Sequence, residues 1–309
     1  MSIAIPVGRR ASVRVPATSA NLGPGFDSLG MALSWTDESS VRVIDYGLEF
    51  SLSGPGSQAL PHDETHLVVR TILETLTEWD MTVPGLAFEA ELSIPLARGL
   101  GSSSAAIVAG LTLAWTLAYP DKPLDREWIF TRAYRIEGHG DNVGPAILGG
   151  FTITWPSTTA DGIAVPQSRP SAIAENIRAL AIIPNTELLT DSARGALPSM
   201  VPMTDAIANL ARSALLVHAM AEEPALLLEA TADRLHQDYR RSLAPSSHAV
   251  MTNLRSQGYA ALTSGAGPTV LVLHTEDQSR GLLEAVEALP EARGMQTRLL
   301  RPGVGVQIL

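Results

Sequence analysis

The most informative part of this chain is residues 95–118, which read PLARGLGSSSAAIVAGLTLAWTLA. The segment 102–118 has no charged residue, which is typical of a helix buried inside a domain. Its apolar part, 105–118, is shorter than the ~20 residues that span a bilayer. Glycines and serines precede this helix, where free N–H groups bind phosphate oxygens. We therefore predict a phosphate-binding loop followed by a buried helix.

Two other loops are rich in glycine and small polar residues. Residues 16–27 read PATSANLGPGFD and follow a predicted strand, and residues 264–269 read SGAGPT between two predicted strands. Glycines let a backbone approach a ligand closely, although each loop alone also fits an ordinary turn or helix cap. No Walker-type loop is present, and the 99–104 segment lacks the third glycine of a dinucleotide fingerprint.

The remaining pattern predicts an α+β protein, because strands and helices do not alternate regularly. Helices are expected at 66–79, 102–118, 125–137, 203–221, 223–235, 246–256 and 277–288. Strands are expected at 12–16, 41–45, 48–52, 86–94, 151–155, 179–183, 258–263, 269–274, 296–300 and 304–308. Residues 41–45 and 48–52 are interpreted as a hairpin, and the Pro/Ser/Thr-rich residues 156–170 as a linker.

Composition excludes several classes of function. The 309 residues contain no cysteine, which removes disulfides, thiolate metal sites and cysteine nucleophiles. The net charge of −10 argues against a nucleic-acid partner, whose binding face is basic. Residues 1–16 lack the apolar core of a signal peptide. We expect a cytoplasmic protein with no membrane partner.

Taken in order, the three loops resemble the three signature motifs of the GHMP small-molecule kinases, and the homoserine kinase family matches best. Its S-A-N-L-G-P-G-F-D motif stands unbroken at Ser19–Asp27. Its E-G-H-P-D-N motif corresponds to Glu137–Asn142, with glycine in place of proline. Two further motifs correspond to 193–198, ARGALP, and 233–240, DRLHQDYR.

The resemblance implies a two-domain GHMP kinase fold. The N-terminal domain would be similar to domain 2 of ribosomal protein S5 and would cover residues 1–168. The C-terminal domain, residues 169–309, would be ferredoxin-like. The active site would lie in the cleft between them, and the protein would form a homodimer.

The resemblance also implies phosphorylation of L-homoserine to O-phospho-L-homoserine, a step of threonine biosynthesis that uses ATP and Mg²⁺. L-threonine would then be an inhibitor. The ATP phosphates would lie against Pro95, Gly99, Leu100, Gly101, Ser102, Ser103, Ser104, Gly265 and Gly267. Ser103 and Glu137 would hold Mg²⁺, which prefers oxygen ligands and keeps several waters.

Homoserine is a zwitterion, so its site needs both signs of charge. Asp27 suits the ammonium group, and Arg194 and Arg240 suit the carboxylate. Asn21, His139 and Asn142 would orient the rest of the substrate. Transfer can depend on positioning and charge alone, and Asp141 is the carboxylate we nominate as a base.

Several alternatives stay open at this point. Arg234 and Arg241 compete with Arg240 for the substrate carboxylate. His62 and His66 are four residues apart, yet their segment looks like a helix start beside the adenine pocket rather than a metal site. A GHMP kinase for another alcohol would not need the zwitterion set, and a non-catalytic sensor would be expected to lose a loop glycine or the metal carboxylate.

Overall fold

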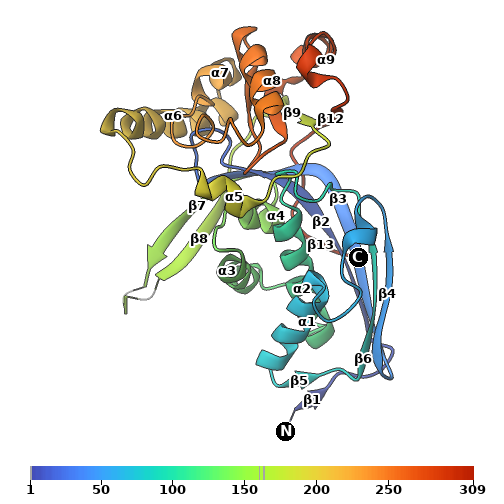
Figure 1. Cartoon of the computed structure of the whole chain (residues 1–309). Helices are drawn as coiled ribbons and strands as arrows, with labels where there is room; N and C mark the ends of the chain where they lie inside the picture. Colours follow the sequence, from blue (N-terminus) through green and yellow to red (C-terminus); the bar gives the residue numbers. More distant parts are fainter. Residues whose placement is uncertain (1, 160, 163) are drawn as a thin grey trace.

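The computed structural model describes residues 2–159, 161–162 and 164–309 and arranges them in two halves, each built on a β-sheet (Figure 1). The N-terminal half has a seven-stranded sheet, and the C-terminal half has a four-stranded sheet. A short parallel pair, β1 (Ile3–Ala4) and β5 (Met81–Thr82), lies near the N-terminus. The predicted α+β class is confirmed. Across the described ranges, no helix has the length and apolar character needed to cross a membrane.

The N-terminal sheet has the order β13-β2-β3-β6-β4, and β7 extends it by pairing with β3 and with β8. Side chains alternate along β2, so that Val13 and Val15 point into the core, as predicted for this strand. The bounds are β2 (Arg10–Ala20), β3 (Leu29–Ile44), β4 (Gly47–Ser53), β6 (Gly85–Glu91), β7 (Phe151–Thr158), β8 (Ala164–Ser171) and β13 (Gln307–Ile308).

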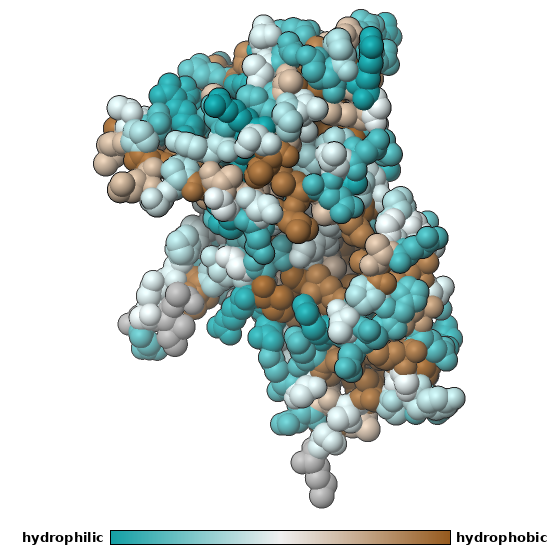
Figure 2. Space-filling model, viewed as in Figure 1, coloured by the Kyte–Doolittle hydropathy of each residue, from teal (hydrophilic) through white to brown (hydrophobic). Residues whose placement is uncertain are grey.

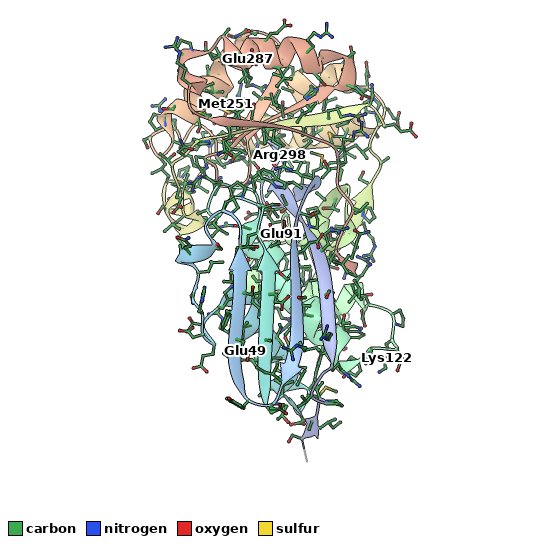
Figure 3. The ribbon with its side chains drawn as sticks, turned by 90° about the vertical axis from the view of Figure 1, so that its right-hand side faces the viewer. Glu49, Glu91, Lys122, Met251, Glu287 and Arg298 are labelled. Atoms are coloured by element: carbon green, nitrogen blue, oxygen red, sulfur yellow. The ribbon has the colours of Figure 1, made fainter. Side chains whose placement is uncertain are left out.

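Four helices cover one face of this sheet: α1 (Leu67–Glu78), α2 (Ser102–Ala118), α3 (Arg126–Glu137) and α4 (Val143–Leu148) (Figure 1). α2 lies between its neighbours and is buried on nearly all sides, which explains why its sequence is apolar all round. The opposite face of the sheet is open and carries carboxylates such as Glu49 and Glu91 (Figure 3). The helices predicted at 66–79, 102–118 and 125–137 are confirmed.

The predicted hairpin of residues 41–45 and 48–52 is wrong. β6 lies between β3 and β4, pairing antiparallel with β3 and parallel with β4. Phe88 of β6 is opposite Val41 on one side and Phe50 on the other. Since Leu86 and Phe88 are fully buried, β6 is a central strand, and both of its edges are covered.

The predicted linker at 156–170 is also wrong, because these residues belong to a hairpin. β7 and β8 pair antiparallel, with Trp155 opposite Gln167 and Pro156 opposite Pro166. Prolines are tolerated in such an outer hairpin, where a missing N–H donor costs little. The boundary expected after residue 168 therefore falls inside β8, and residues 160 and 163 lie outside the described part.

The C-terminal sheet has the order β10-β11-β9-β12, with every neighbouring pair antiparallel. The chain order β-α-β-β-α-β and this strand order are those of a ferredoxin-like fold. Its strands are β9 (Ile177–Ile183), β10 (Ala260–Thr263), β11 (Val270–Thr275) and β12 (Gln296–Leu300). Its helices are α5 (Thr190–Gly195), α6 (Met203–Ala221), α7 (Leu227–Ala230), α8 (Pro245–Ser256) and α9 (Ser279–Glu287).

The helix predicted at 223–235 is too long. The turn η2 (Pro224–Leu226) and α7 end at Ala230, and a tight turn follows. The buried carboxylate of Asp233 accepts backbone N–H groups of Leu235, His236 and Gln237 at 2.8–3.0 Å. A side chain that binds its own backbone in this way competes with helix formation.

The end of the chain returns to the N-terminal half. β13 pairs with β2, and isolated bridges join Leu33 to Pro302 and Gly149 to Val304. The two halves are therefore connected twice, once between β8 and β9 and once after β12.

Candidate functional site

The three glycine-rich loops meet in one cleft between the two halves. A cavity of about 220 Å³ lies there, closed by the loop between α3 and α4 and by α5. Its lining includes Asn21, Phe26, Asp27, Gly99, Gly101, Ser102, Ser103, Glu137, His139, Asp141, Asn142, Thr190, Arg194, Arg240, Gly265 and Gly267. Segments that are far apart in the sequence thus form one site.

The N-terminus of α2 points into this cleft without a side-chain cap. Gly101, the N-cap residue, has φ 70°, and a Cβ there would lie 2.0 Å from Thr18 Oγ1. Gly99 has φ 73°, and a Cβ would lie 2.3 Å from the Ser264 carbonyl oxygen. Both positions therefore require glycine. The free N–H groups of the helix end can donate hydrogen bonds to an anion.

Glu137 connects α3 to this helix end. Its two carboxylate oxygens accept the hydroxyls of Ser103 at 3.0 Å and Ser104 at 2.9 Å. Ser104 is fully buried, whereas Ser103 is exposed to the cleft. Among the described residues, no cluster of three or more His, Cys, Asp or Glu could hold a metal alone. One hydroxyl and one carboxylate suit Mg²⁺, which shares its coordination with phosphate and water.

Asn21 connects the first glycine-rich loop, residues 16–27, to the third, residues 264–269. Its Nδ2 donates to the Gly265 carbonyl at 2.9 Å, and its Oδ1 accepts the Asp27 N–H at 3.0 Å. Asn21 is buried and has φ 68°, a conformation that asparagine tolerates better than most residues. The amide therefore positions Asp27, and Asn21 itself also lines the cavity.

Opposite charges gather at the end of the cleft. Both terminal nitrogens of Arg194 donate hydrogen bonds to the Asp27 carboxylate, at 2.8 and 3.1 Å. This hydrogen bonding raises the pKa of Arg194. Arg240 is buried nearby, and both guanidinium groups lie within 6 Å of the Phe26 ring centre, at 5.8 and 5.6 Å. Burial and the charge of Arg194 lower the pKa of Arg240.

Three acceptors hold Arg240 in place. Its Nε donates to the Ala193 carbonyl at 3.1 Å, and its Nη1 lies 3.2 Å from the Gly265 carbonyl and 3.1 Å from His236 Nδ1. His236 is fully buried, and its Nε2 is 2.8 Å from the Gly23 carbonyl. Burial lowers the pKa of His236, so it is a neutral support that donates to Gly23 and accepts from Arg240.

The competing arginines lie elsewhere. Arg234 donates to Asp205 at 3.2 Å, and Arg234 and Arg241 line a separate surface hollow together with Asp238. Of the three candidates, Arg240 is therefore the one whose side chain reaches the cleft lining.

The loop between α3 and α4 contributes two polar pairs. His139 Nδ1 lies 2.7 Å from Asp141 Oδ1, and Asp141 is almost completely buried. Burial alone would lower the pKa of His139, but the hydrogen bond and charge of Asp141 outweigh it and raise that pKa. Asn142 Oδ1 accepts the hydroxyl of Thr18 at 2.8 Å. This bond leaves the Asn142 Nδ2 group free to donate into the cleft.

A second, largely apolar cavity of about 240 Å³ shares Ser102 and Ser103 with the first. Leu67, Phe88 and other apolar groups line it, together with His66. His66 is buried, and both of its ring nitrogens lack a hydrogen-bond partner. Burial lowers the pKa of His66, which keeps the ring neutral and able both to donate and to accept.

His62 and His66 both pack against the Phe50 ring. His62 stacks on Phe50 with ring centres 5.5 Å apart, while His66 packs against Phe88 at 5.0 Å. The interpretation of this region as the border of a nucleotide pocket stays a prediction.

Most predicted site residues meet in the cleft, with three differences. Pro95 lines a separate hollow beside Trp35 and Arg298, at the junction of the two sheets (Figure 3). Leu100 and Ser104 are buried below the loop and support it. Four features of the site were not predicted from the sequence: Thr18, Phe26, Thr190 and the unpartnered nitrogens of His66. Thr18 and Phe26 belong to the quoted first loop, which was the available signal.

The chain is similar to known proteins over most of its length. Two family models, described as GHMP kinases N terminal domain and GHMP kinases C terminal, match residues 66–150 and 187–292. A homoserine kinase of Corynebacterium urealyticum is 46% identical over 285 residues, 92% of each chain. A homoserine kinase of Corynebacterium jeikeium is 43% identical over 98% of this chain and 97% of its own. The crystal structure of homoserine kinase from Cytophaga hutchinsonii has 26% identity, 97% coverage of both chains and a TM-score of 0.82.

Proposed function

Because this chain belongs to the homoserine kinases of the GHMP kinase superfamily, we propose that its central cleft binds L-homoserine and the adjoining apolar cavity binds adenine. The enzyme is an ATP-dependent kinase that converts L-homoserine to O-phospho-L-homoserine and ADP. The observation that carries the assignment of the cleft is the group Asp27, Arg194 and Arg240 at one end of the cavity.

These charges match a zwitterionic amino acid. Asp27 binds the ammonium group, and Arg194 and Arg240 bind the carboxylate in a fork geometry. Asp27 and Arg194 bind each other in the structure. A zwitterion separates this pair at little electrostatic cost, because it gives each side chain a new partner. Mevalonate has one charge and a sugar has none, so neither gives both Asp27 and Arg194 a new charged partner, which disfavours these acceptors.

GHMP kinases use ATP with Mg²⁺. The neutral ring of His66 supplies a donor and an acceptor for the edge of the base inside an otherwise apolar pocket. The phosphates lie at the start of α2, against the loop from Gly99 to Ser104 and beside Gly265 and Gly267. Ser103 and Glu137 would hold Mg²⁺, which would neutralise negative charge on the phosphates.

The reaction is an in-line displacement. The homoserine hydroxyl oxygen bonds to the γ-phosphorus, the bond to the bridging β–γ oxygen breaks, and ADP leaves. The Nδ2 group of Asn142 stabilises the charge that develops near the transferred group. Asp141, oriented by His139, accepts the hydroxyl proton.

Three further properties belong to the same proposal. L-threonine carries the same zwitterion and a hydroxyl, so it competes with homoserine for Asp27, Arg194 and Arg240 and inhibits the enzyme. The protein acts in the cytoplasm, within threonine biosynthesis. It works as a homodimer.

The test is ADP release with MgATP and one acceptor at a time: L-homoserine, mevalonate, galactose, L-serine or L-threonine. We expect turnover with L-homoserine and its loss in Asp27→Ala and Arg240→Ala. Arg241→Ala is the matched control, because this arginine lies outside the cleft lining. Equal turnover with mevalonate or galactose would contradict the assignment of the cleft, as would full activity of Arg240→Ala.

A further inference from the structure

An acidic residue on the inner face of β3 lines the apolar cavity beside the phosphate-binding loop. Asp37 is opposite Val15 of β2, so both side chains lie on the face of the sheet that the helices cover. Ser39, the next residue on this face, also lines the cavity, whereas Val41 and Val43 continue the face as apolar core. The polar residues of this strand face therefore coincide with the cavity. A carboxylate at such a position is costly unless a partner compensates it.

The contacts of Asp37 with the backbone use one of its two oxygens. Oδ1 accepts the N–H groups of Ser93 and Ile94, at 2.6 and 2.9 Å. Within the described part of the chain, no cation forms an ion pair with Asp37. Burial raises the pKa of Asp37, against the lowering effect of its hydrogen bonds. A carboxylate offers about four lone-pair sites, so Oδ2 can still accept a hydrogen bond from a ligand.

The register of the strands places Asp37 between the phosphate-binding loop and His66. In one direction, β2 continues to Thr18, whose N–H donates to the carbonyl of Leu100 in that loop. In the other direction, four residues farther along β3, Phe88 of β6 packs its ring against His66 with ring centres 5.0 Å apart. The order along the sheet is therefore phosphate-binding loop, Asp37, His66.

A nucleotide has its groups in the same order. Its sugar joins the phosphates to the base, so phosphates at the start of α2 and a base beside His66 bring the sugar to the level of Asp37. Figure 2 shows apolar residues gathered in the recess below the C-terminal half, in the region of α1 and α2 where this cavity lies. Among the described residues that line the cavity, Asp37 is the acidic one. Carboxylates accept ribose hydroxyls in other nucleotide sites.

We propose that Oδ2 of Asp37 accepts a hydrogen bond from a ribose hydroxyl of the nucleotide and makes the site selective for ribonucleotides. This inference rests on the nucleotide site proposed above, and it adds a residue of β3 to the groups that hold the nucleotide. The sugar is remote from the transferred phosphate. The contact therefore acts on nucleotide binding and not on the chemical step.

The test compares ATP with 2′-deoxy-ATP and 3′-deoxy-ATP by calorimetric titration in the presence of Mg²⁺. In the wild type, we expect at least one deoxy analogue to bind about 10-fold or more weakly than ATP, as for a lost hydrogen bond to a charged group. Asp37→Asn keeps an oxygen for the N–H groups of Ser93 and Ile94 and replaces the other oxygen by an amide nitrogen. In this variant the ratio of affinities should fall to about threefold or less, because a neutral amide makes a weaker hydrogen bond than a carboxylate.

Glu38→Gln is the matched control. The side chain of Glu38 points to the opposite face of β3 and pairs there with Arg14, so this variant should keep the wild-type ratio. Equal binding of ATP and both analogues by the wild type would overturn the proposal, and this comparison needs no substitution. An unchanged ratio in Asp37→Asn would also overturn it. Failure of ATP itself to bind would contradict the nucleotide site and, with it, the proposal.

Discussion

Arg240 is fixed before any substrate arrives. Its contacts with Ala193, Gly265 and His236 restrict the guanidinium to one orientation, so little entropy is lost on binding a carboxylate. Arg240→Lys keeps the charge but loses the fork geometry, and we expect KM for homoserine to rise by about 10- to 100-fold, as for a lost charged hydrogen bond. Steady-state kinetics measure this, with Arg241→Lys as the control. An unchanged KM in Arg240→Lys would remove Arg240 from the substrate site.

Thr18 controls which end of the Asn142 amide faces the cleft. Thr18→Val removes the hydroxyl at nearly constant volume, so Asn142 can turn its amide and aim its oxygen at the phosphates. We expect kcat to fall about 10-fold or more with little change in KM, because the lost interaction acts in the transition state. Thr18→Ser should restore kcat. If Thr18→Val and Thr18→Ser lose activity equally, the hydroxyl does not orient Asn142.

The raised pKa of His139 has a consequence for stability. The protonated form, paired with Asp141, is favoured in the folded state, so its contribution is complete below the unfolded pKa of about 6.5. That contribution disappears as the pH rises through the folded pKa. In urea unfolding, the free energy of unfolding of the wild type should exceed that of His139→Gln by a larger margin near pH 5.5 than near pH 8.5. A difference that grows with pH would show that the pKa is lowered instead.

At the scale of elements, the N-terminus of α2 depends on a glycine that has no room for a side chain. Gly101→Ala introduces a Cβ 2.0 Å from Thr18 Oγ1 in a left-handed conformation. The loop must move, so we expect KM for ATP to rise about 10-fold or more while homoserine binding changes less. Gly294→Ala is the matched control, with φ 80° and no neighbour within 4 Å. Calorimetric titration of both variants with an ATP analogue measures nucleotide affinity separately from homoserine binding. Unchanged nucleotide affinity in Gly101→Ala would move the phosphates away from this helix end.

What the sequence could predict differs between elements for a physical reason. α2 was located residue for residue, because its signal is local: a glycine-rich start followed by an uninterrupted apolar run. The hairpin of β3 and β4 failed because the strand between them, β6, comes from a part of the chain some forty residues later. The residues of the turn between β3 and β4 carry no information about a strand so distant in the sequence.

In the site too, local motifs could be predicted from the sequence and long-range contacts could not. Residues such as Asp27 and Glu137 belong to recognisable motifs, and the structure brings them to one cleft. The pairing of Thr18 with Asn142 joins residues 124 positions apart, and the unpartnered state of His66 depends on its packing. Neither leaves a pattern in the sequence.

At the scale of the whole molecule, the returning chain end is part of the N-terminal core. Val306 is 1% exposed beneath α4, whereas Val304 is 62% exposed two residues earlier. Val306→Ala should lower the free energy of unfolding by about 1–2 kcal/mol, from two lost methyl groups. Val304→Ala should have almost no effect. Denaturant unfolding followed by circular dichroism compares the pair, and equal stability of both variants would show that the tail is not packed in solution.

The division of the chain into domains after residue 168 stays a prediction. The tail pairs with β2 and hydrogen-bonds to Arg126 through the Val306 carbonyl, so any domain that contains residues 1–168 also needs the last few residues. A fragment that ends near residue 171 would leave one edge of the first sheet open.

The position of β13 also determines the order of events during synthesis. β13, the edge partner of β2, lies far downstream in the chain and is made roughly 15 to 60 s after β2 at 5–20 residues per second. Domains usually fold in the order in which they emerge, yet here the sheet of the N-terminal half gains its edge strand only after all the strands of the C-terminal sheet have been made. A nascent chain therefore exposes the unpaired edge of β2 while the C-terminal half is translated, and such an edge can pair with another chain.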